Sequence, residues 1–336
     1  MKELDFGPIE NANFDRVQLP EEVLDWIAQN KLWNLWVPKI YGGLELGLSQ
    51  GLRVQKELAR VDGSLGWTQT LCSGANFFIG NLQEEVIEET FGSFGNRTCF
   101  GGSGMPWGEA HKEGEQYRIS GKWKYATGAP HLTHFTLNAR IMENGKEVLG
   151  LDGKPVIKSF LLSRSQVEVI EDWNTMGLKA TASHSFAVKD QLVHQKYAFH
   201  YNQTYLPYPV FKIPFGKFAD LTLWVNYLGM AEHFLLEAKA VRPQVDFEAL
   251  ANIVSDAIRT IDRFAMQVET ATDKGESFSE KLAEEIHSSG ANCVRAISSE
   301  LIQVYSRLGM RACSEGQPLN KIFRDYFTAT QHANFV

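Results

Sequence analysis

The sequence predicts an α+β fold in which a β region lies between two helical regions. Apolar residues keep helical spacing up to about residue 95, alternating short segments lie between Gly-rich turns over 96–212, and long helical stripes follow from 213 onward. We therefore expect an N-terminal helical domain over 1–95, a middle β-barrel or sandwich domain over 96–212, and a C-terminal four-helix-bundle-type domain over 213–336. Junctions between such layers are common sites for small ligands.

The N-terminal region contains several helix signals. Glu21 and Glu22 follow Pro20 and open a helix with apolar positions at helical spacing. A turn at 38–43 precedes a second helix, for which Ser49 is a candidate cap, and a turn at 62–64 precedes a third apolar stretch. A short amphipathic helix over 84–91 closes the region.

The two later regions differ in their periodicity. Segments such as 116–120, 134–138 and 159–162 alternate in polarity, which is typical of strands. Apolar residues then step by three or four from Phe247 to Val268, and pairs four residues apart recur every eleven residues between Leu282 and Leu308. These stripes predict two long helices whose apolar faces form a bundle core.

Composition excludes several classes of protein. The 336-residue chain has a net charge of −7 and lacks the basic patch that a nucleic-acid binder usually shows. We expect no membrane span and no signal peptide, and we expect a cytoplasmic protein. The four cysteines, Cys72, Cys99, Cys293 and Cys313, form no CxxC pair. We therefore expect reduced, mostly buried thiols and no metal site.

Five segments, in order along nearly the whole chain, resemble motifs of the acyl-CoA dehydrogenase superfamily. Residues 37–44 are similar to its P-x-x-Y/F-G-G turn and 57–64 to the helix end that follows. Residues 121–128 resemble the strand that lines the flavin, 173–183 a later strand, and 323–325 the R-D at the start of the last helix. The resemblance implies a flavin-binding fold.

Four segments are closer to one subgroup, the reduced-flavin-dependent two-component monooxygenases that hydroxylate aromatic or related rings. They are 106–110, 123–128 with His131, 181–185, and 324–332, and the last is the most specific. The resemblance implies reduced flavin (FMN or FAD) supplied by a separate reductase, O2, and an aromatic or polyketide-like small-molecule substrate. It also implies a homotetramer built through the C-terminal bundle.

The last helix lacks the residue that dehydrogenation requires. Removing a proton α to a thioester needs a carboxylate base opposite the flavin. Most dehydrogenases of the superfamily place a Glu about nine residues after the Arg of R-D, but here that position is Ala333, preceded by His332. The subgroup uses a His at this place to hydrogen-bond activated oxygen or help deprotonate a phenol, so we predict that His332 is catalytic.

The resemblance also assigns candidate contacts. Tyr125 can stack on the flavin ring, the Thr127 hydroxyl can reach its N5 or O4 and take part in catalysis, and Ser103 lies near its pyrimidine end. The spacing of Tyr125 and Thr127 also fits one face of an ordinary strand. Arg324 is a further cofactor contact, and we expect the substrate to contact Trp107, Ser183 and His184.

One departure from the superfamily bears on the cofactor. Between Val241 and Phe247 the chain lacks the R-x-x-F-G stretch whose Arg holds the FAD pyrophosphate of a neighbouring subunit in longer members. This absence favours FMN or loosely held reduced flavin. Two alternatives stay open: an acyl-CoA dehydrogenase with a displaced base, for which Glu232 and Glu237 are candidates, and a non-catalytic member of the fold.

Overall fold

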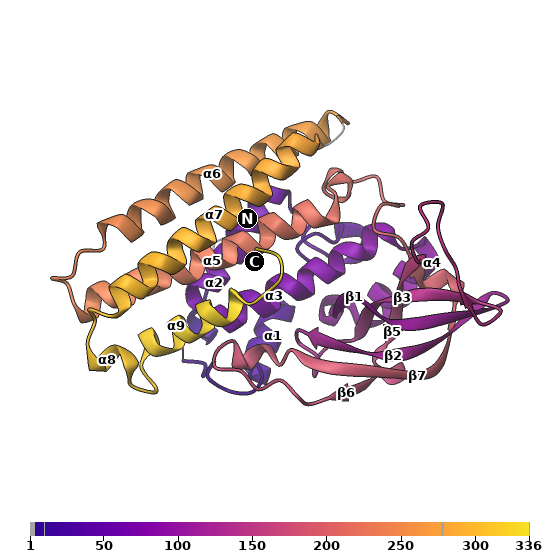
Figure 1. Cartoon of the computed structure of the whole chain (residues 1–336), viewed down its shortest axis with the longest axis horizontal. Coiled ribbons are helices and arrows are strands. Elements are labelled where there is room, and N and C mark those ends of the chain that lie inside the picture. The colour runs from indigo at the N-terminus through magenta and orange to yellow at the C-terminus, as the bar shows by residue number, and fades with distance from the viewer. Residues whose placement is uncertain (1–3, 10, 277–278, 336) are drawn as a thin grey trace.

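The computed structural model describes residues 4–9, 11–276 and 279–335. Long helices form one side of the molecule, the sheet forms the other, and helix α3 lies between them (Figure 1). The helices are α1 (Glu21–Gln29), α2 (Leu48–Val61), α3 (Gly63–Asn76), α4 (Glu84–Ile87), α5 (Phe215–Val241), α6 (Glu248–Asp273), α7 (Glu280–Tyr305), α8 (Met310–Cys313) and α9 (Pro318–Ala329).

The described strands form one mixed sheet in the order β6-β7-β2-β1-β3-β5-β8, with β4 paired to β3. Their bounds are β1 (Phe100–Glu113), β2 (Gln116–Ala126), β3 (His134–Glu143), β4 (Lys146–Glu147), β5 (Ile157–Ser163), β6 (Glu168–Ile170), β7 (His184–His194) and β8 (Ala198–Phe199). Strands β1 and β3 are parallel, and the other pairs are antiparallel. The end of β2 points toward the helices (Figure 1).

Helix α3 is the centre of the molecule because almost all of its residues are buried. Its N-cap, Asp62, accepts hydrogen bonds from the backbone N–H groups of Ser64 (2.8 Å) and Leu65 (3.1 Å). The helix packs against α2, α5 and β1, so it touches the helical layers and the sheet at once. The residues around it are therefore well placed to connect a site on the sheet with the bundle.

An aromatic cluster also joins the three regions of the chain. Phe77, which follows α3, stacks on Phe218 of α5 with ring centroids 4.2 Å apart. Its neighbour Phe78 stacks on Tyr201, which follows β8, at 4.7 Å. Phe218 also meets Trp36 edge-on at 5.0 Å. We call these five residues the aromatic junction.

The predicted fold class is confirmed, and two local expectations are wrong. Ser49 is not the cap of α2: the N-cap is Gly47, and the Glu269 carboxylate accepts hydrogen bonds from both the backbone N–H and the hydroxyl of Ser49. The segment 173–183 is an irregular loop with one 3-10 turn and not a strand. Within the described residues, no helix combines the length and apolar character needed to cross a bilayer.

Candidate functional site

Two β-bulges distort neighbouring strands at the sheet end that faces the helices. Between Ser103 and Gly108, four residues of β1 lie opposite one residue of β3. Between Trp123 and Ala126, two residues of β2 lie opposite one residue of β7. Extending the β1–β2 register beyond Gly108 brings the first bulge opposite the second. Bulges re-aim side chains and are frequent next to active sites.

The bulges turn large apolar side chains outward. Tyr125 has a positive φ of 68° and is 63% exposed, and Trp107 on the other bulge is 42% exposed. A positive φ is costly for a bulky residue and is found mainly where function requires it. Tyr125 meets Trp173 edge-on at 6.2 Å, and Met105 and Met176 are exposed beside them in sequence. Exposed apolar side chains of this kind can mark a ligand-binding surface.

A chain of buried hydroxyl groups begins at Thr127, two residues after Tyr125. Thr127 Oγ1 and Ser183 Oγ are 2.9 Å apart, and Ser183 Oγ lies 2.8 Å from Thr181 Oγ1. Thr181 Oγ1 donates to the carbonyl of Leu178 (2.8 Å). The backbone N–H of Gly128 donates to the carbonyl of Thr181 (2.8 Å), which fixes the end of β2 against the 173–183 loop. The sequence predicted Thr127 and Ser183 separately, and the structure brings them together.

The 173–183 loop is held against the last helix. Leu178 and Ala182 both have positive φ angles, at 50° and 43°. The backbone N–H of Leu178 donates to Asp325 (2.6 Å), and a Cβ added at Gly177 would lie 2.2 Å from the backbone of Arg324. The close approach therefore requires glycine at 177. This contact brings α9 to the edge of the bulge region.

Lys321 is the centre of an ionic cluster with Asp62 and Asp325, which we call the Lys321 junction. Its ammonium lies 2.5 Å from the carboxylates of both Asp62 and Asp325. Burial alone would lower the pKa of Lys321, but the two carboxylates outweigh it and raise that pKa. Burial and the neighbouring Asp62 raise the pKa of Asp325 against the attraction of Lys321. The three residues connect the start of α3, helix α9 and the 173–183 loop.

Arg324 does not present a free guanidinium. Its Nε donates to Asn320 Oδ1 (2.9 Å), one terminal nitrogen pairs with Asp15 (3.2 Å), and the other donates to the carbonyl of Met176. The sequence predicted Arg324 as a cofactor contact. In the structure, the hydrogen bond from Arg324 to the carbonyl of Met176 holds the 173–183 loop on α9.

His332 lies in the segment that follows α9, next to Trp67 of α3. The two rings meet edge-on with centroids 5.5 Å apart, and His332 Nδ1 accepts from the backbone N–H of Asn334 (3.3 Å). The side chain is exposed to solvent, yet desolvation by the surrounding protein lowers its pKa. Both observations fit a residue that lines a recess, and they favour a neutral imidazole at neutral pH.

The remaining predicted residues are also placed by the structure. Ser103 and Trp107 border the β1 bulge, and Ser103 is half-buried. His184 begins β7 and its Nδ1 accepts from the backbone N–H of Trp173 (3.0 Å), so it stands at the same sheet end. Apart from Arg324 on α9, the predicted flavin and substrate contacts therefore lie along the first half of β1, at the end of β2 and at the start of β7.

The described residues after α9 contain no carboxylate, in agreement with the sequence. Glu232, a candidate for a displaced base, is ion-paired with Lys56 of α2 at 2.5 Å. Glu237 lies further along the same helix, α5, toward the end at Val241. Asp325 is buried and committed to Lys321 and Leu178. Two of these carboxylates, those of Glu232 and Asp325, are therefore held in ion pairs.

Sequence reasoning missed three parts of this region. Lys321 gave no signal because its partners Asp62 and Asp325 come from distant segments. Trp67 sits within an apolar stretch, and only the fold shows that it touches His332. The cysteine spacing gave no hint that Cys72, on α3, lies below the Thr127 turn, where its thiol approaches the Thr127 carbonyl at 3.7 Å.

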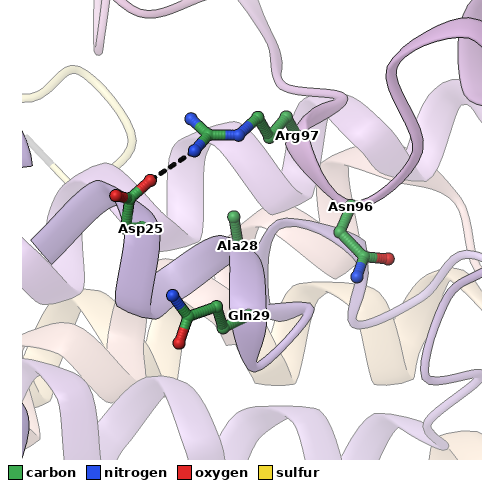
Figure 2. Close-up of a pocket in the computed structure, with 5 residues that line it drawn as sticks. All are labelled: Asp25, Ala28, Gln29, Asn96 and Arg97. Atoms are coloured by element: carbon green, nitrogen blue, oxygen red, sulfur yellow. Dashed lines mark hydrogen bonds and ion pairs between the residues drawn. The ribbon is translucent and has the colours of Figure 1, made fainter. Parts of the chain in front are cut away.

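Two surface cavities lie elsewhere. One, of about 250 Å³, is lined by Asp25, Ala28, Gln29, Asn96 and Arg97, with an Asp25–Arg97 ion pair at its rim (Figure 2). The other, of about 550 Å³, is lined by residues at the far end of β7, among them His194 and Lys196. Neither cavity contains a residue that the sequence assigned to flavin or substrate.

Comparisons with known proteins find relatives of the chain among flavin-dependent monooxygenases. No family model matches it. It is 29% identical to an indole-3-acetate monooxygenase of Pseudomonas putida over 67% of this chain and 56% of that protein, so it spans little more than half of that relative. It is 22% identical to the flavin-dependent monooxygenase oxygenase subunit HsaA of Rhodococcus jostii, over 95% of this chain and 88% of that protein.

Solved structures agree on the fold. XiaF from Streptomyces, solved with FADH2 and glycerol, superimposes with a TM-score of 0.87 at 23% identity, over 98% of this chain and 89% of XiaF. At that identity the likeness speaks for the fold. Together with the sequence relatives, it confirms the resemblance: the chain is a relative of the oxygenase subunits of flavin-dependent two-component monooxygenases and has their acyl-CoA-dehydrogenase-like fold.

Proposed function

We propose that this chain is the oxygenase component of a two-component monooxygenase, which hydroxylates an aromatic or polyketide-like small molecule with reduced flavin and O2. The observation that carries the proposal is the pair of bulges that presents Tyr125 beside the buried Thr127–Ser183 hydroxyls. It occurs in a chain whose relatives include monooxygenases and a resorcinol hydroxylase described as FADH2-dependent. Fold alone would not support an activity.

The flavin contacts would come from the bulges. The exposed ring of Tyr125 would stack on the isoalloxazine, and Ser103 would approach its pyrimidine end. The Thr127 hydroxyl, held by Ser183, would hydrogen-bond the N5 or O4 edge. Arg324 would support the cofactor through the 173–183 loop that it holds. When bound, the reduced flavin supplies the electrons that activate O2.

His332 and Thr127 are the proposed catalytic residues. Because desolvation by the surrounding protein lowers the pKa of His332 and favours its neutral form, its imidazole could accept a phenolic proton or hydrogen-bond the reacting oxygen. Trp107, Ser183 and His184 would border the substrate. Trp107 offers an apolar face on the β1 bulge, and the Nε2 edge of His184 stays available because Nδ1 accepts from Trp173.

The same proposal covers the partner protein, the oligomeric state, the choice of flavin and the cellular location. A separate reductase would deliver reduced flavin, and four copies would associate through the C-terminal bundle. The connection from Val241 to Glu248 is short and lacks the pyrophosphate-binding arginine motif, which supports FMN or loosely held FAD. Three buried thiols and the acidic composition are in keeping with action in the cytoplasm.

The test begins with anaerobic titration of the purified protein with reduced FMN and FADH2 side by side. The flavin complex is then mixed with O2 and a panel of phenols and indoles, and hydroxylated product and H2O2 are measured. We expect one flavin to be preferred and product to form. Tyr125→Ala should weaken flavin binding at least ~tenfold, corresponding to about 1.4 kcal/mol, whereas Tyr205→Ala, an exposed tyrosine elsewhere, should not.

Two other results would reject the proposal. Absence of flavin binding under any of these conditions would identify a non-catalytic member of the fold. Bleaching of bound oxidised FAD by acyl-CoA compounds would identify a dehydrogenase with its base at an unexpected place.

A further inference from the structure

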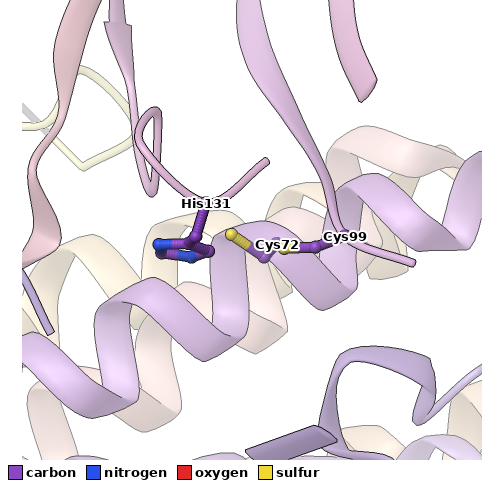
Figure 3. A group of neighbouring side chains, drawn as sticks. All are labelled: Cys72, Cys99 and His131. Carbon is purple, nitrogen blue, oxygen red and sulfur yellow. The ribbon is translucent and has the colours of Figure 1, made fainter. Parts of the chain in front are cut away.

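Three soft-metal ligands meet below the candidate site. Cys72 comes from α3, Cys99 directly precedes β1, and His131 lies in the turn after β2 (Figure 3). One ligand atom from each residue lies within 4.8 Å of the other two. The three residues are far apart in sequence, so only the fold brings them together. We call them the Cys2His cluster.

The two thiols of the cluster are buried, His131 is half-buried, and one nitrogen of its ring is unsatisfied. The side chains of Cys72 and Cys99 are 0% and 1% exposed. The Nε2 atom of His131 is buried and has no hydrogen-bond partner among the described residues. Buried polar atoms are almost always satisfied by protein, water or an ion, so this nitrogen requires an explanation.

We propose that the Cys2His cluster binds one Zn²⁺ ion. Thiolate sulfur and neutral imidazole nitrogen are the ligands that Zn²⁺ prefers, and two cysteines with one histidine is a known set that leaves a fourth position. The carbonyl oxygen of Thr127 lies 3.7 Å from Cys72 Sγ. Two thiolates balance the charge of the ion, so the occupied site is neutral and suited to burial.

The surroundings hold the ligands in place. The ring of Trp33 stacks on His131, with centroids 5.4 Å apart. The backbone N–H of Cys99 donates to Thr133 Oγ1, which donates in turn to the carbonyl of Cys99, both at 3.0 Å. Gly128 has a φ of +77°, and an added Cβ there would lie 2.7 Å from His131 Nε2. Supports of this kind orient metal ligands and raise affinity.

The location gives the ion a structural task. The turn that carries His131 begins at Thr127, at the end of β2, and α3 carries Cys72 beneath it. A bound ion would fasten this turn to α3 and to the start of β1. The inference does not depend on the proposed function, because metal binding can be measured without flavin or substrate.

The experiment uses the full chain, free of flavin. Metal content is measured by mass spectrometry after purification without chelators. The chelator-treated protein is then titrated with Co²⁺, whose thiolate complexes absorb in the near ultraviolet and the visible, and the Co²⁺ is displaced with Zn²⁺. We expect one equivalent per chain, a thiolate charge-transfer band, and a rise in the midpoint temperature of unfolding with Zn²⁺.

Substitutions of the three cluster residues test whether each one binds the metal ion. Cys72→Ser and Cys99→Ser should each remove part of the charge-transfer band, and His131→Gln should weaken Co²⁺ binding at least ~tenfold. The matched controls are Cys293→Ser, a buried thiol on α7, and Cys313→Ser, an exposed thiol, which should leave the titration unchanged. If the ligand variants fail to fold, alkylation of the wild-type protein in partly unfolding urea decides, because both cluster thiols are buried in the folded state. Zn²⁺ should slow the alkylation of Cys72 and Cys99 relative to the metal-free protein and leave that of Cys313 unchanged.

Three outcomes would overturn the proposal. The wild-type protein could show no stoichiometric uptake of either ion. The charge-transfer band could survive in both cysteine variants of the cluster. Finally, protein purified under reducing conditions could carry a Cys72–Cys99 disulfide, seen as the loss of two hydrogens in the intact mass, which would make the cluster a redox pair.

Discussion

His332 shows how the environment of a single side chain can suit it to a chemical role. It is accessible to solvent, and yet enough protein surrounds it that its pKa is lowered. An accessible, neutral imidazole can exchange protons with a small molecule that reaches it. The edge-on contact with Trp67 fixes the ring to the central helix.

We predict that His332→Gln separates flavin binding from hydroxylation. Because general acid–base groups contribute ~10²–10⁴-fold, hydroxylated product per reduced flavin should fall at least ~tenfold and H2O2 should rise, with flavin affinity unchanged. In the wild-type protein, the yield of product should decline as the pH falls through the lowered pKa of His332, where the imidazole gains a proton. His194→Gln, at the opposite end of β7, is the control and should retain the wild-type yield.

His134 gives a prediction about stability. Burial lowers the pKa of this histidine to about 4, whereas an unfolded histidine titrates near ~6.5. Above pH 6.5 both states are neutral and the residue has no effect. Between pH 6.5 and pH 4 the histidine is protonated in the unfolded state and stays neutral in the folded state. The free energy of unfolding therefore falls by roughly 3 kcal/mol in total. Chemical denaturation of wild type and His134→Gln across this range should show a smaller loss in the variant.

At the scale of elements, the sequence predicts the long helices better than it predicts the irregular strands around the candidate site. The stripe from Leu250 to Val268 is buried along α6 as its spacing predicted, because a helical face depends only on local sequence. The bulges at Ser103–Gly108 and Trp123–Ala126 depend on the register with neighbouring strands, which sequence spacing does not contain. The 173–183 segment, expected to be a strand, is a loop that is held on α9 by the hydrogen bond from the backbone N–H of Leu178 to Asp325. Sequence spacing does not show this long-range contact.

The same limit explains which site residues could be found. Tyr125, Thr127 and His332 stand in motifs, so a resemblance was enough to select them. Cys72 and Cys99 stand in none, and their meeting with His131 is a product of the tertiary fold. Ionic contacts between distant segments, such as Lys321 with Asp62, are hidden for the same reason.

The Lys321 junction should be sensitive to loss of its cation. Lys321→Met keeps the size of the side chain and leaves Asp62 and Asp325 buried without a counter-charge. Breaking a buried pair in this way costs about 3–5 kcal/mol, so the free energy of unfolding should drop by that order in urea titrations. Lys281→Met removes an exposed lysine of α7 and should change it by less than ~0.5 kcal/mol. Equal effects of the two substitutions would contradict the role given to the junction.

For the whole molecule, the resemblance predicts a homotetramer. The bundle helices expose large apolar side chains, including Leu236 on α5, Met266 on α6 and Ile302 on α7. Such residues are enriched where copies associate. Light scattering coupled to gel filtration should give about four times the chain mass of 37.8 kDa. Ile302→Glu should shift the mass toward smaller species, whereas Glu300→Gln on the same helix should not; a monomeric wild type would refute the prediction.

The aromatic junction has a consequence for how this fold can be rebuilt. Phe77, Phe218 and Tyr201 come from the three regions of the chain, and each region supplies part of one shared core. The regions are therefore not interchangeable modules. A chimera that takes its β region from another protein would have to keep an aromatic residue at position 201 as well, or Phe78 would lose its stacking partner. Substitutions of the exposed residues on the bulges, such as Trp107 and Tyr125, would by contrast leave that core packed as it is.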